Sequence, residues 1–253
     1  MNILVCNDDG INAQGLEILA AVLSKKHDVT VAAPDDERSG SSHSLTFHSY
    51  LRYEKVKFPG GLPAYKIYGT PADCVKFGLG NIMKLKPDIV VSGINRGPNL
   101  GTDIMYSGTV AAAFEAAYLG YRAVAVSINK FKDDTGLYTS AAEFVADRLD
   151  VFADFVLPYN TVININYPDF PREEVKGAVI TPAGYQDYSD VYVPDRETEG
   201  RWWLRGDPLP ERHGRNGDDC DIERIKKGFI TVTPVTFDTT DYKAIEQMRG
   251  LKL

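Results

Sequence analysis

The chain has 253 residues, of which 43% are hydrophobic and 25% charged, and its formal net charge at pH 7 is -7. This composition is typical of a globular protein and excludes disordered, fibrous and membrane-spanning classes. The negative charge disfavours a nucleic-acid polymer as the main partner and favours a small-molecule site. Three widely spaced cysteines without a CxxC pair, and no leader-like or bilayer-length apolar run, predict a cytoplasmic protein without a membrane partner.

Strand-like and helix-like segments alternate along most of the chain. The predicted strands are residues 1–6, 29–33, 64–68, 88–92, 123–127 and 162–165, and the predicted helices are residues 16–23, 71–79, 109–119 and 138–152. A hairpin is also expected within residues 45–58. The runs DIVVS and AVAVS are short and rich in β-branched residues, as are parallel strands buried between two helix layers. The pattern predicts an α/β protein with a Rossmann-like, doubly wound, mostly parallel sheet.

The character of the chain changes in its last quarter. Residues 186–228 are rich in charge, proline and glycine and contain Trp202 and Trp203, whereas residues 228–238 have a β pattern and residues 242–251 a helical one. We therefore predict a catalytic domain over residues 1–185. Residues 186–253 are predicted to form a β-rich extension with a hairpin and a terminal helix, used for oligomer contacts.

Two adjacent acids, Asp8 and Asp9, follow the first predicted strand in the motif NDDG. Just past a strand, with Gly10 permitting a turn, both side chains can converge on one point. Two carboxylates so close must share a proton or a cation, and a hard divalent ion such as Mg²⁺ or Mn²⁺ would relieve their repulsion. The alternative is a turn in which one aspartate caps the next helix.

Two further loops at the same sheet edge offer neutral oxygens. The run RSGSS contains Ser39 and can supply hydroxyl groups to a metal or a phosphate, and SGINRGPNLG contains Asn95, whose carbonyl oxygen suits a metal. His43, just after RSGSS, could act as an acid or base, although a single loop histidine is usually structural or exposed. A solvated loop and a long turn are the alternative readings of the two runs.

The fourth loop, YSGTVAAA, opens a helix with Ser107, Gly108 and Thr109. Free N–H groups and the helix dipole make such a start an anion site, although an ordinary serine or threonine cap is the alternative. Acids and neutral oxygens for a cation, beside an anion-binding helix start, are what metal-assisted phosphoryl hydrolysis requires. No GxGxxG follows the first strand and no GxxxxGK[ST] motif occurs, which disfavours nicotinamide and P-loop chemistry.

Together, NDDG, RSGSS, SGINRGPNLG, YSGTVAAA and the late GFITVTP segment resemble the SurE family, the stationary-phase survival proteins that act as metal-dependent nucleotidases. The resemblance runs from Met1 to about Asp238. It implies one divalent metal ion, Mg²⁺ or Mn²⁺. The implied metal ligands are Asp8, Asp9, Ser39 and Asn95, the catalytic residues are Asp8 and Asp9, and the phosphate-binding residues are Asn95, Ser107, Gly108 and Thr109.

The resemblance further implies a 5′-nucleotidase, a phosphoric monoester hydrolase that converts nucleoside 5′- and 3′-monophosphates to nucleoside and phosphate. Some members also act on short polyphosphates. It also implies a homodimer or homotetramer joined by exchanged C-terminal segments and a hairpin. Two alternatives stay open: a metal-dependent nucleotide- or phosphate-binding regulator without turnover, and a hydrolase of other phosphate esters. Whether an aspartate serves as base or as nucleophile also stays open.

Overall fold

The computed structural model describes residues 1–209 and 216–251. In these residues a nine-stranded sheet has the order β3-β4-β2-β1-β5-β6-β7-β13-β8. Its strands are β1 (Asn2–Cys6), β2 (Asp28–Pro34), β3 (Tyr53–Val56), β4 (Ala64–Ile67), β5 (Ile89–Arg96), β6 (Ala123–Ile128), β7 (Thr161–Tyr167), β8 (Ala178–Ile180) and β13 (Ile230–Thr236). The predicted fold class is confirmed.

The sheet changes direction of winding at β1. This strand is parallel to both of its neighbours, β2 and β5. The chain builds outward from β1 through β2 and β4, then returns to β5 and builds the other half through β6 and β7. The crevice outside the carboxyl ends of β1 and β5 is therefore a topological switch point, the usual ligand position in such sheets.

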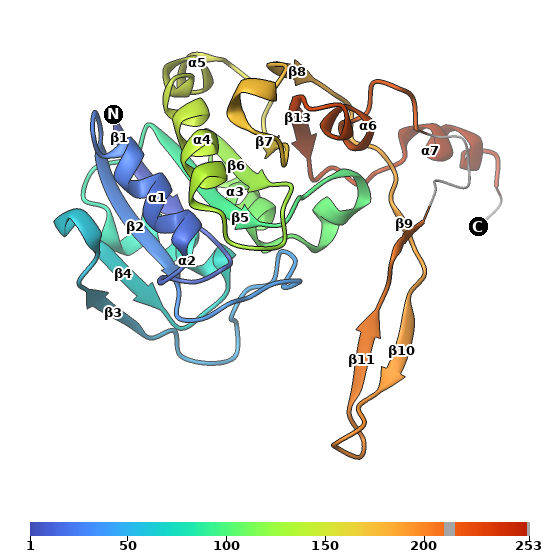
Figure 1. The fold of residues 1–253 in the computed structure, drawn as a ribbon, viewed down its shortest axis with the longest axis horizontal. Coiled ribbons are helices and arrows are strands. Elements are labelled where there is room, and N and C mark those ends of the chain that lie inside the picture. The colour runs from blue at the N-terminus through green and yellow to red at the C-terminus, as the bar shows by residue number, and fades with distance from the viewer. Residues whose placement is uncertain (210–215, 252–253) are drawn as a thin grey trace.

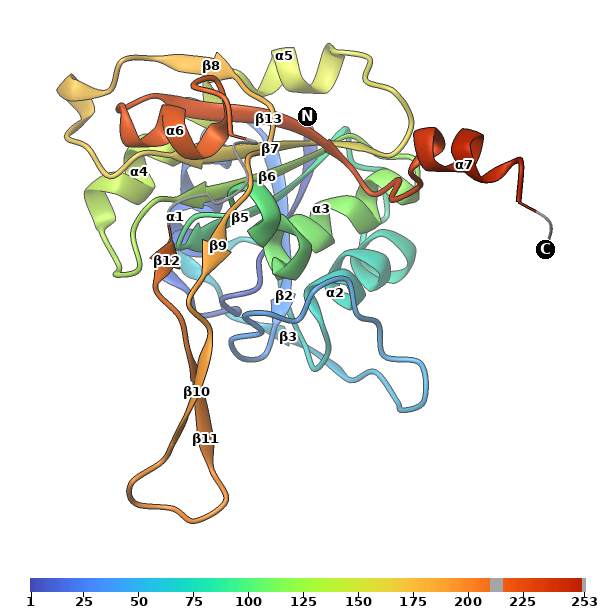
Figure 2. The same cartoon turned by 90° about the vertical axis from the view of Figure 1, so that its right-hand side faces the viewer.

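Helices cover both faces of this sheet, as Figure 2 shows. On one face lie α1 (Gln14–Leu23), α4 (Thr135–Ala146) and α5 (Leu149–Asp154), and on the other lie α2 (Pro71–Phe77) and α3 (Gly108–Tyr118). Helix α3 buries ten of its eleven residues, and its small alanine side chains allow it to lie close to the strands. The position of its first turn is consequently fixed against the sheet.

The C-terminal part leaves the sheet and later returns to it. The short strands β9 (Asp187–Tyr188) and β12 (Pro208–Leu209) pair at the base of an arm, and β10 (Val191–Pro194) and β11 (Trp202–Arg205) form the arm itself, which projects from the body in Figure 1. Helix α6 (Asp221–Lys226) precedes β13, and α7 (Tyr242–Met248) stands apart from the body. Short helical turns complete the chain: η1 (Pro59–Gly61), η2 (Gly78–Ile82), η3 (Gly101–Tyr106) and η4 (Arg172–Glu174).

Several predicted elements need correction. The hairpin within residues 45–58 is wrong, because in that range only β3 is a strand, and it pairs antiparallel with β4. The helix predicted over residues 138–152 is divided into α4 and α5. The division at residue 185 stays a prediction, and residues 230–236 return to the sheet as β13, between β7 and β8. Within the described residues, no helix has the length and apolar character needed to cross a membrane.

Candidate active site

The acid pair lies at the switch point, directly after β1. Asp8 is buried, with 4% of its surface exposed, and Asp9 is partly buried. Burial raises the pKa of Asp8, and burial also raises the pKa of Asp9 to about 7. The negative charge of Glu37 acts on both carboxyl groups in the same direction. One buried and one partly buried carboxyl group, both with raised pKa values, therefore form a site whose charged form a cation would stabilise.

Each acid is held by a group from a distant segment. The Thr109 hydroxyl donates to Asp8 Oδ1 from the first turn of α3. The backbone N–H of Arg96 donates to Asp9 Oδ2 at 3.0 Å from the end of β5. The Arg38 N–H also donates to the Asp8 carbonyl oxygen at 2.7 Å. These contacts hold the acid pair against the start of α3, the end of β5 and the loop that follows β2.

Gly108 allows α3 to approach the acid pair. A Cβ atom at this position would lie 2.8 Å from Asp8 Cβ and 2.9 Å from Asp8 Oδ2. Both distances are well inside normal van der Waals contact, so any side chain would push α3 away from Asp8. The glycine of the YSGTV motif is thus explained by a close approach.

The other candidate residues line one cleft with Asp8. Ser39, Asn95 and Ser107 are part of its wall, and its volume is about 1180 Å³. The Asn95 Nδ2 donates to the Gly97 carbonyl oxygen at 2.8 Å, which fixes the orientation of the amide. Ser107 Oγ caps α3 by accepting from the Val110 N–H at 3.0 Å. The fold thus brings these three predicted residues to the edge where the acids lie.

The position of Ser39 differs in one respect from that expected of a ligand. Its side chain is exposed, and its hydroxyl donates to Glu37 Oε1 at 2.7 Å. Glu37 in turn pairs with the Arg96 guanidinium at 3.1 Å. Ser39 is therefore at the rim of the cleft, within a chain of polar contacts that runs back to the residue holding Asp9.

Two groups near the site escaped the sequence analysis. Arg96 directly follows Asn95, but its backbone contact with Asp9 joins segments 87 residues apart and leaves no local signal. Glu115, buried on α3, accepts from Lys76 Nζ at 2.7 Å and lies 2.9 Å from His43 Nε2. His43 thus anchors the loop of Ser39 to α3. An acid amid the alanines of α3 was the available signal.

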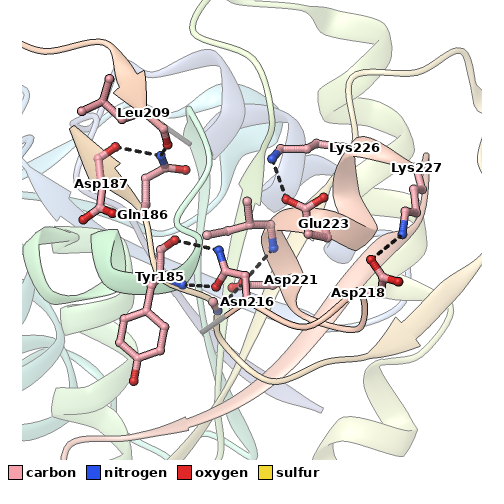
Figure 3. Close-up of polar contacts among 12 residues, drawn as sticks. Tyr185, Gln186, Asp187, Leu209, Asn216, Asp218, Asp221, Glu223, Lys226 and Lys227 are labelled. Carbon is pink, nitrogen blue, oxygen red and sulfur yellow. Dashed lines mark hydrogen bonds and ion pairs between the residues drawn. The ribbon is translucent and has the colours of Figure 1, made fainter. Parts of the chain in front are cut away.

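The far wall of the cleft comes from the base of the arm. Gln186 and Tyr188 line the cleft. Two hydrogen bonds join them to η3: Thr102 Oγ1 donates to the Gln186 carbonyl oxygen at 3.0 Å, and the Tyr188 hydroxyl donates to the Asp103 carboxylate. Figure 3 shows the surroundings, where Asn216 forms a reciprocal pair of hydrogen bonds with the Tyr185 backbone.

Asp221 lies close to this region and is fully buried. Its carboxylate accepts from the N–H groups of Gly101 at 2.8 Å, Gly184 at 2.7 Å and Ile222 at 2.8 Å. Gly101 begins η3, and Gly184 precedes the base of the arm. One carboxylate therefore ties the loop that leads to α3 to the segment that forms the opposite wall.

The donor set fits a hard divalent cation. No group of three or more His, Cys, Asp or Glu side chains with metal-binding geometry occurs in residues 1–209 and 216–251. The available oxygens are two carboxylates, the Asn95 amide and hydroxyl groups, which suit Mg²⁺ or Mn²⁺ better than zinc. The buried carboxylates with raised pKa values supply the physical reason for a cation at this point.

The comparison with family models gives one match. A model described as "Survival protein SurE" matches residues 3–190, which include all four loops that line the acid pair. The match ends in the base of the arm, two residues after β9.

Relatives and a solved structure extend the similarity to the whole chain. The 5′-nucleotidase SurE of Carboxydothermus hydrogenoformans is 40% identical over 254 residues, covering 98% of this chain and 95% of that protein. The 5′-nucleotidase SurE of Geobacter sulfurreducens is 42% identical over 255 residues, covering 100% and 94%. A crystal structure of the SurE protein from Aquifex aeolicus aligns with a TM-score of 0.81 and 33% identity, covering 98% of both chains.

Proposed function

The chain belongs to the SurE family, and we propose that it is a metal-dependent 5′-nucleotidase, a phosphoric monoester hydrolase. Its substrates are nucleoside 5′- and 3′-monophosphates, and its products are a nucleoside and phosphate. The observation that carries the proposal is the junction of the buried acid pair with the first turn of α3, made by Thr109 and Asp8. This contact supports the proposal, because a carboxylate that a cation would stabilise lies beside a helix start that would stabilise an anion.

The metal-binding groups are Asp8, Asp9, the Asn95 carbonyl oxygen and Ser39. A divalent ion bound there supplies Lewis-acid stabilisation of the charge that develops on the phosphoryl oxygens. The Thr109 hydroxyl and the Arg96 N–H hold the two carboxylates in place. The hydrogen bond from Asn95 Nδ2 to the Gly97 carbonyl oxygen fixes the orientation of the Asn95 side-chain amide. The chain thus preorganises its ligands before substrate arrives.

The phosphate binds at the start of α3, where Ser107, Gly108 and Thr109 lie and where the helix dipole favours negative charge. Asn95, on the neighbouring strand end, is the fourth group of this subsite. Water attacks phosphorus in line. In that case Asp8 or Asp9 takes the proton of the water as the P–O bond to the nucleoside breaks. In the alternative, one of these carboxylates attacks phosphorus first and displaces the nucleoside, and water then hydrolyses the aspartyl phosphate to release phosphate.

The cleft is larger than a phosphate ion needs. Its volume of about 1180 Å³ has room for a complete nucleotide, and its walls include Tyr106, Phe131 and Tyr188. Phe131 and Tyr106 expose 80% and 65% of their surface, so both rings are open to a ligand. Aromatic surface beyond the phosphate site supports a nucleoside as the leaving group.

We propose a homodimer or homotetramer as the assembled form. The arm exposes more than half of Trp202, Trp203 and Leu204, and α7 exposes Tyr242 and Met248 to a similar extent. Large apolar side chains on projecting elements are characteristic of surfaces that a second protein covers. Light scattering tests this assembly. A cytoplasmic location, expected from the cysteines, is part of the same proposal.

The function is tested with a panel of phosphate esters assayed with Mg²⁺ and with Mn²⁺. The panel contains 5′-AMP, 3′-AMP, 5′-GMP, 4-nitrophenyl phosphate and tripolyphosphate. The proposal predicts that the nucleoside monophosphates give the highest kcat/KM, and activity on tripolyphosphate would add the short-polyphosphate reaction. Tight metal-dependent binding of AMP without any phosphate release would instead identify a regulator. Preference for a phosphate ester without a base would place the enzyme among other hydrolases.

A further inference from the structure

Ser41 carries a buried hydroxyl beside the proposed phosphate site. Among the described residues this Oγ atom has no hydrogen-bond partner. It lies 2.9 Å from the point that a Cβ atom on Gly108 would occupy, and Asp8 Oδ2 lies 2.9 Å from the same point. The hydroxyl is thus close to both the acid pair and the first turn of α3.

The backbone around Ser41 is held from both sides. Its own N–H donates to the Arg38 carbonyl oxygen at 3.2 Å, and the next N–H, that of Ser42, donates to the Tyr106 carbonyl oxygen at 3.1 Å. His43 is then anchored on Glu115 of α3 at 2.9 Å. These contacts fix the backbone of the loop at Ser41, and therefore the position of its Cβ atom.

The neighbouring hydroxyls are already engaged. Thr109 donates its side-chain proton to Asp8, and Ser107 Oγ accepts the Val110 N–H as the cap of α3. A buried hydroxyl without a partner is unfavourable, and a hydrogen bond to a ligand would remove that cost. The Ser41 hydroxyl can donate a hydrogen bond to an anion without losing a side-chain hydrogen bond of its own.

We propose that Ser41 binds the substrate by donating its hydroxyl proton to a phosphoryl oxygen bound at the first turn of α3. The inference rests on the proposed function, because it names a further residue of the same phosphate subsite. It assigns to Ser41 a role in substrate binding that is separate from metal binding by Ser39.

The test is the variant Ser41→Ala, with Ser42→Ala as a matched control from the same loop. With Mg²⁺ present, removal of the hydroxyl is expected to lower kcat/KM for AMP by roughly 10- to 100-fold, as for loss of a hydrogen bond to a charged group. Calorimetric titration with inorganic phosphate is expected to show Kd raised by about 10-fold or more. The melting temperature of Ser41→Ala should be unchanged or higher, because an unsatisfied polar group has been removed. Ser42→Ala should match the wild type in all three measurements.

Two outcomes would overturn the role of Ser41. In the first, Ser41→Ala hydrolyses AMP and binds phosphate as the wild type does, which leaves the proposed function intact. In the second, the variant loses thermal stability together with activity, as it would if Ser41 only held Asp8. If the wild type hydrolyses no nucleotide, the proposed function fails, and the phosphate titration still decides whether Ser41 binds the anion. A wild type that binds no phosphate would overturn both.

Discussion

The side-chain hydroxyl of Thr109 donates to the carboxylate of Asp8, across 101 residues of sequence. Thr109 is fully buried and Asp8 is 4% exposed, so this contact is shielded from water. It joins the proposed metal-binding carboxylate to the helix start proposed to bind phosphate. This hydrogen bond therefore helps to fix the relative position of the two halves of the proposed site, together with the close approach of Gly108 to Asp8.

The variant Thr109→Val keeps the shape of the side chain and removes the hydroxyl. Asp8 then loses a hydrogen bond to its charged form, and we expect kcat/KM for AMP to fall about 10- to 100-fold. Thr109→Ser should restore most of the activity. The control is Thr139→Val, because Thr139 Oγ1 only donates to the Thr135 carbonyl oxygen on an exposed face of α4. Equal activity of Thr109→Val and the wild type in steady-state kinetics would contradict this role.

Gly108→Ala tests the close approach of α3 to the acids. The added methyl group would meet Asp8 Cβ at 2.8 Å, so α3 or β1 must shift. We expect activity to fall about 100-fold or more, since displacements of this kind are costly in an active site. Gly136→Ala is the matched control, because a Cβ there meets no atom closer than 3.4 Å. The control should retain activity, and an active Gly108→Ala enzyme would show that the approach is not required.

Glu115→Gln tests the anchor between α3 and the serine-rich loop. The change removes the charge that Lys76 and His43 contact, and we expect the free energy of unfolding at neutral pH to fall by about 1–2 kcal/mol. Denaturant unfolding measures this difference. Glu223→Gln, which breaks a surface pair with Lys226, should change the free energy by less than about 1 kcal/mol.

The same variant should also alter the acid dependence of stability. Burial raises the pKa of Glu115, but the hydrogen bonds from His43 and Lys76 outweigh it and hold that pKa below its ordinary value of 4.5. A carboxyl group whose pKa is lowered by folding stabilises the protein above its unfolded pKa, and this contribution is lost as pH falls through the folded pKa. The wild type should therefore lose stability more steeply than Glu115→Gln below about pH 4.5. Parallel curves would refute the anchor.

Asp221→Asn tests the tie between η3 and the base of the arm. The carboxylate accepts three N–H groups, whereas an amide has one acceptor oxygen and would turn an NH₂ group towards a donor. We expect the free energy of unfolding to fall by about 1–3 kcal/mol and KM for AMP to rise as the cleft wall loosens. Asp218→Asn, at an exposed contact with Lys227, is the control. A variant with unchanged stability and KM would remove Asp221 from this role.

Local sequence patterns were sufficient to predict the helices on both faces of the sheet and most of its strands. They failed where pairing is set by distant segments. Residues 45–52 carry apolar residues suited to a strand but form none, and Thr46 instead bonds to the Asp73 carboxylate. Strand β13 enters the sheet between β7 and β8 only because of tertiary packing. The strand predicted to end at residue 92 also continues through Asn95 as part of β5, with a shift in its pairing with β6 between Ser92 and Asn95. The local sequence did not predict this continuation.

The residue types that follow the predicted strands were sufficient to predict that Asp8, Ser39, Asn95 and Ser107 lie near one another, and all four line one cleft. The contacts that orient them could not be predicted in the same way. The backbone N–H of Arg96, which holds Asp9, is a donor that almost every residue type possesses, so its sequence gives no clue. The engagement of Ser39 with Glu37 depends on where two exposed side chains meet.

The central claim is that the acid pair acts through a divalent cation in phosphate-ester hydrolysis. It is tested most directly by phosphate release from 5′-AMP, measured in EDTA, after restoration of Mg²⁺ or Mn²⁺, and with the folded variants Asp8→Asn and Asp9→Asn. We predict no release in EDTA, recovery with either metal, and a loss of roughly 100-fold or more in each variant. Full activity of the wild type in EDTA, or of either variant with metal, would contradict the claim.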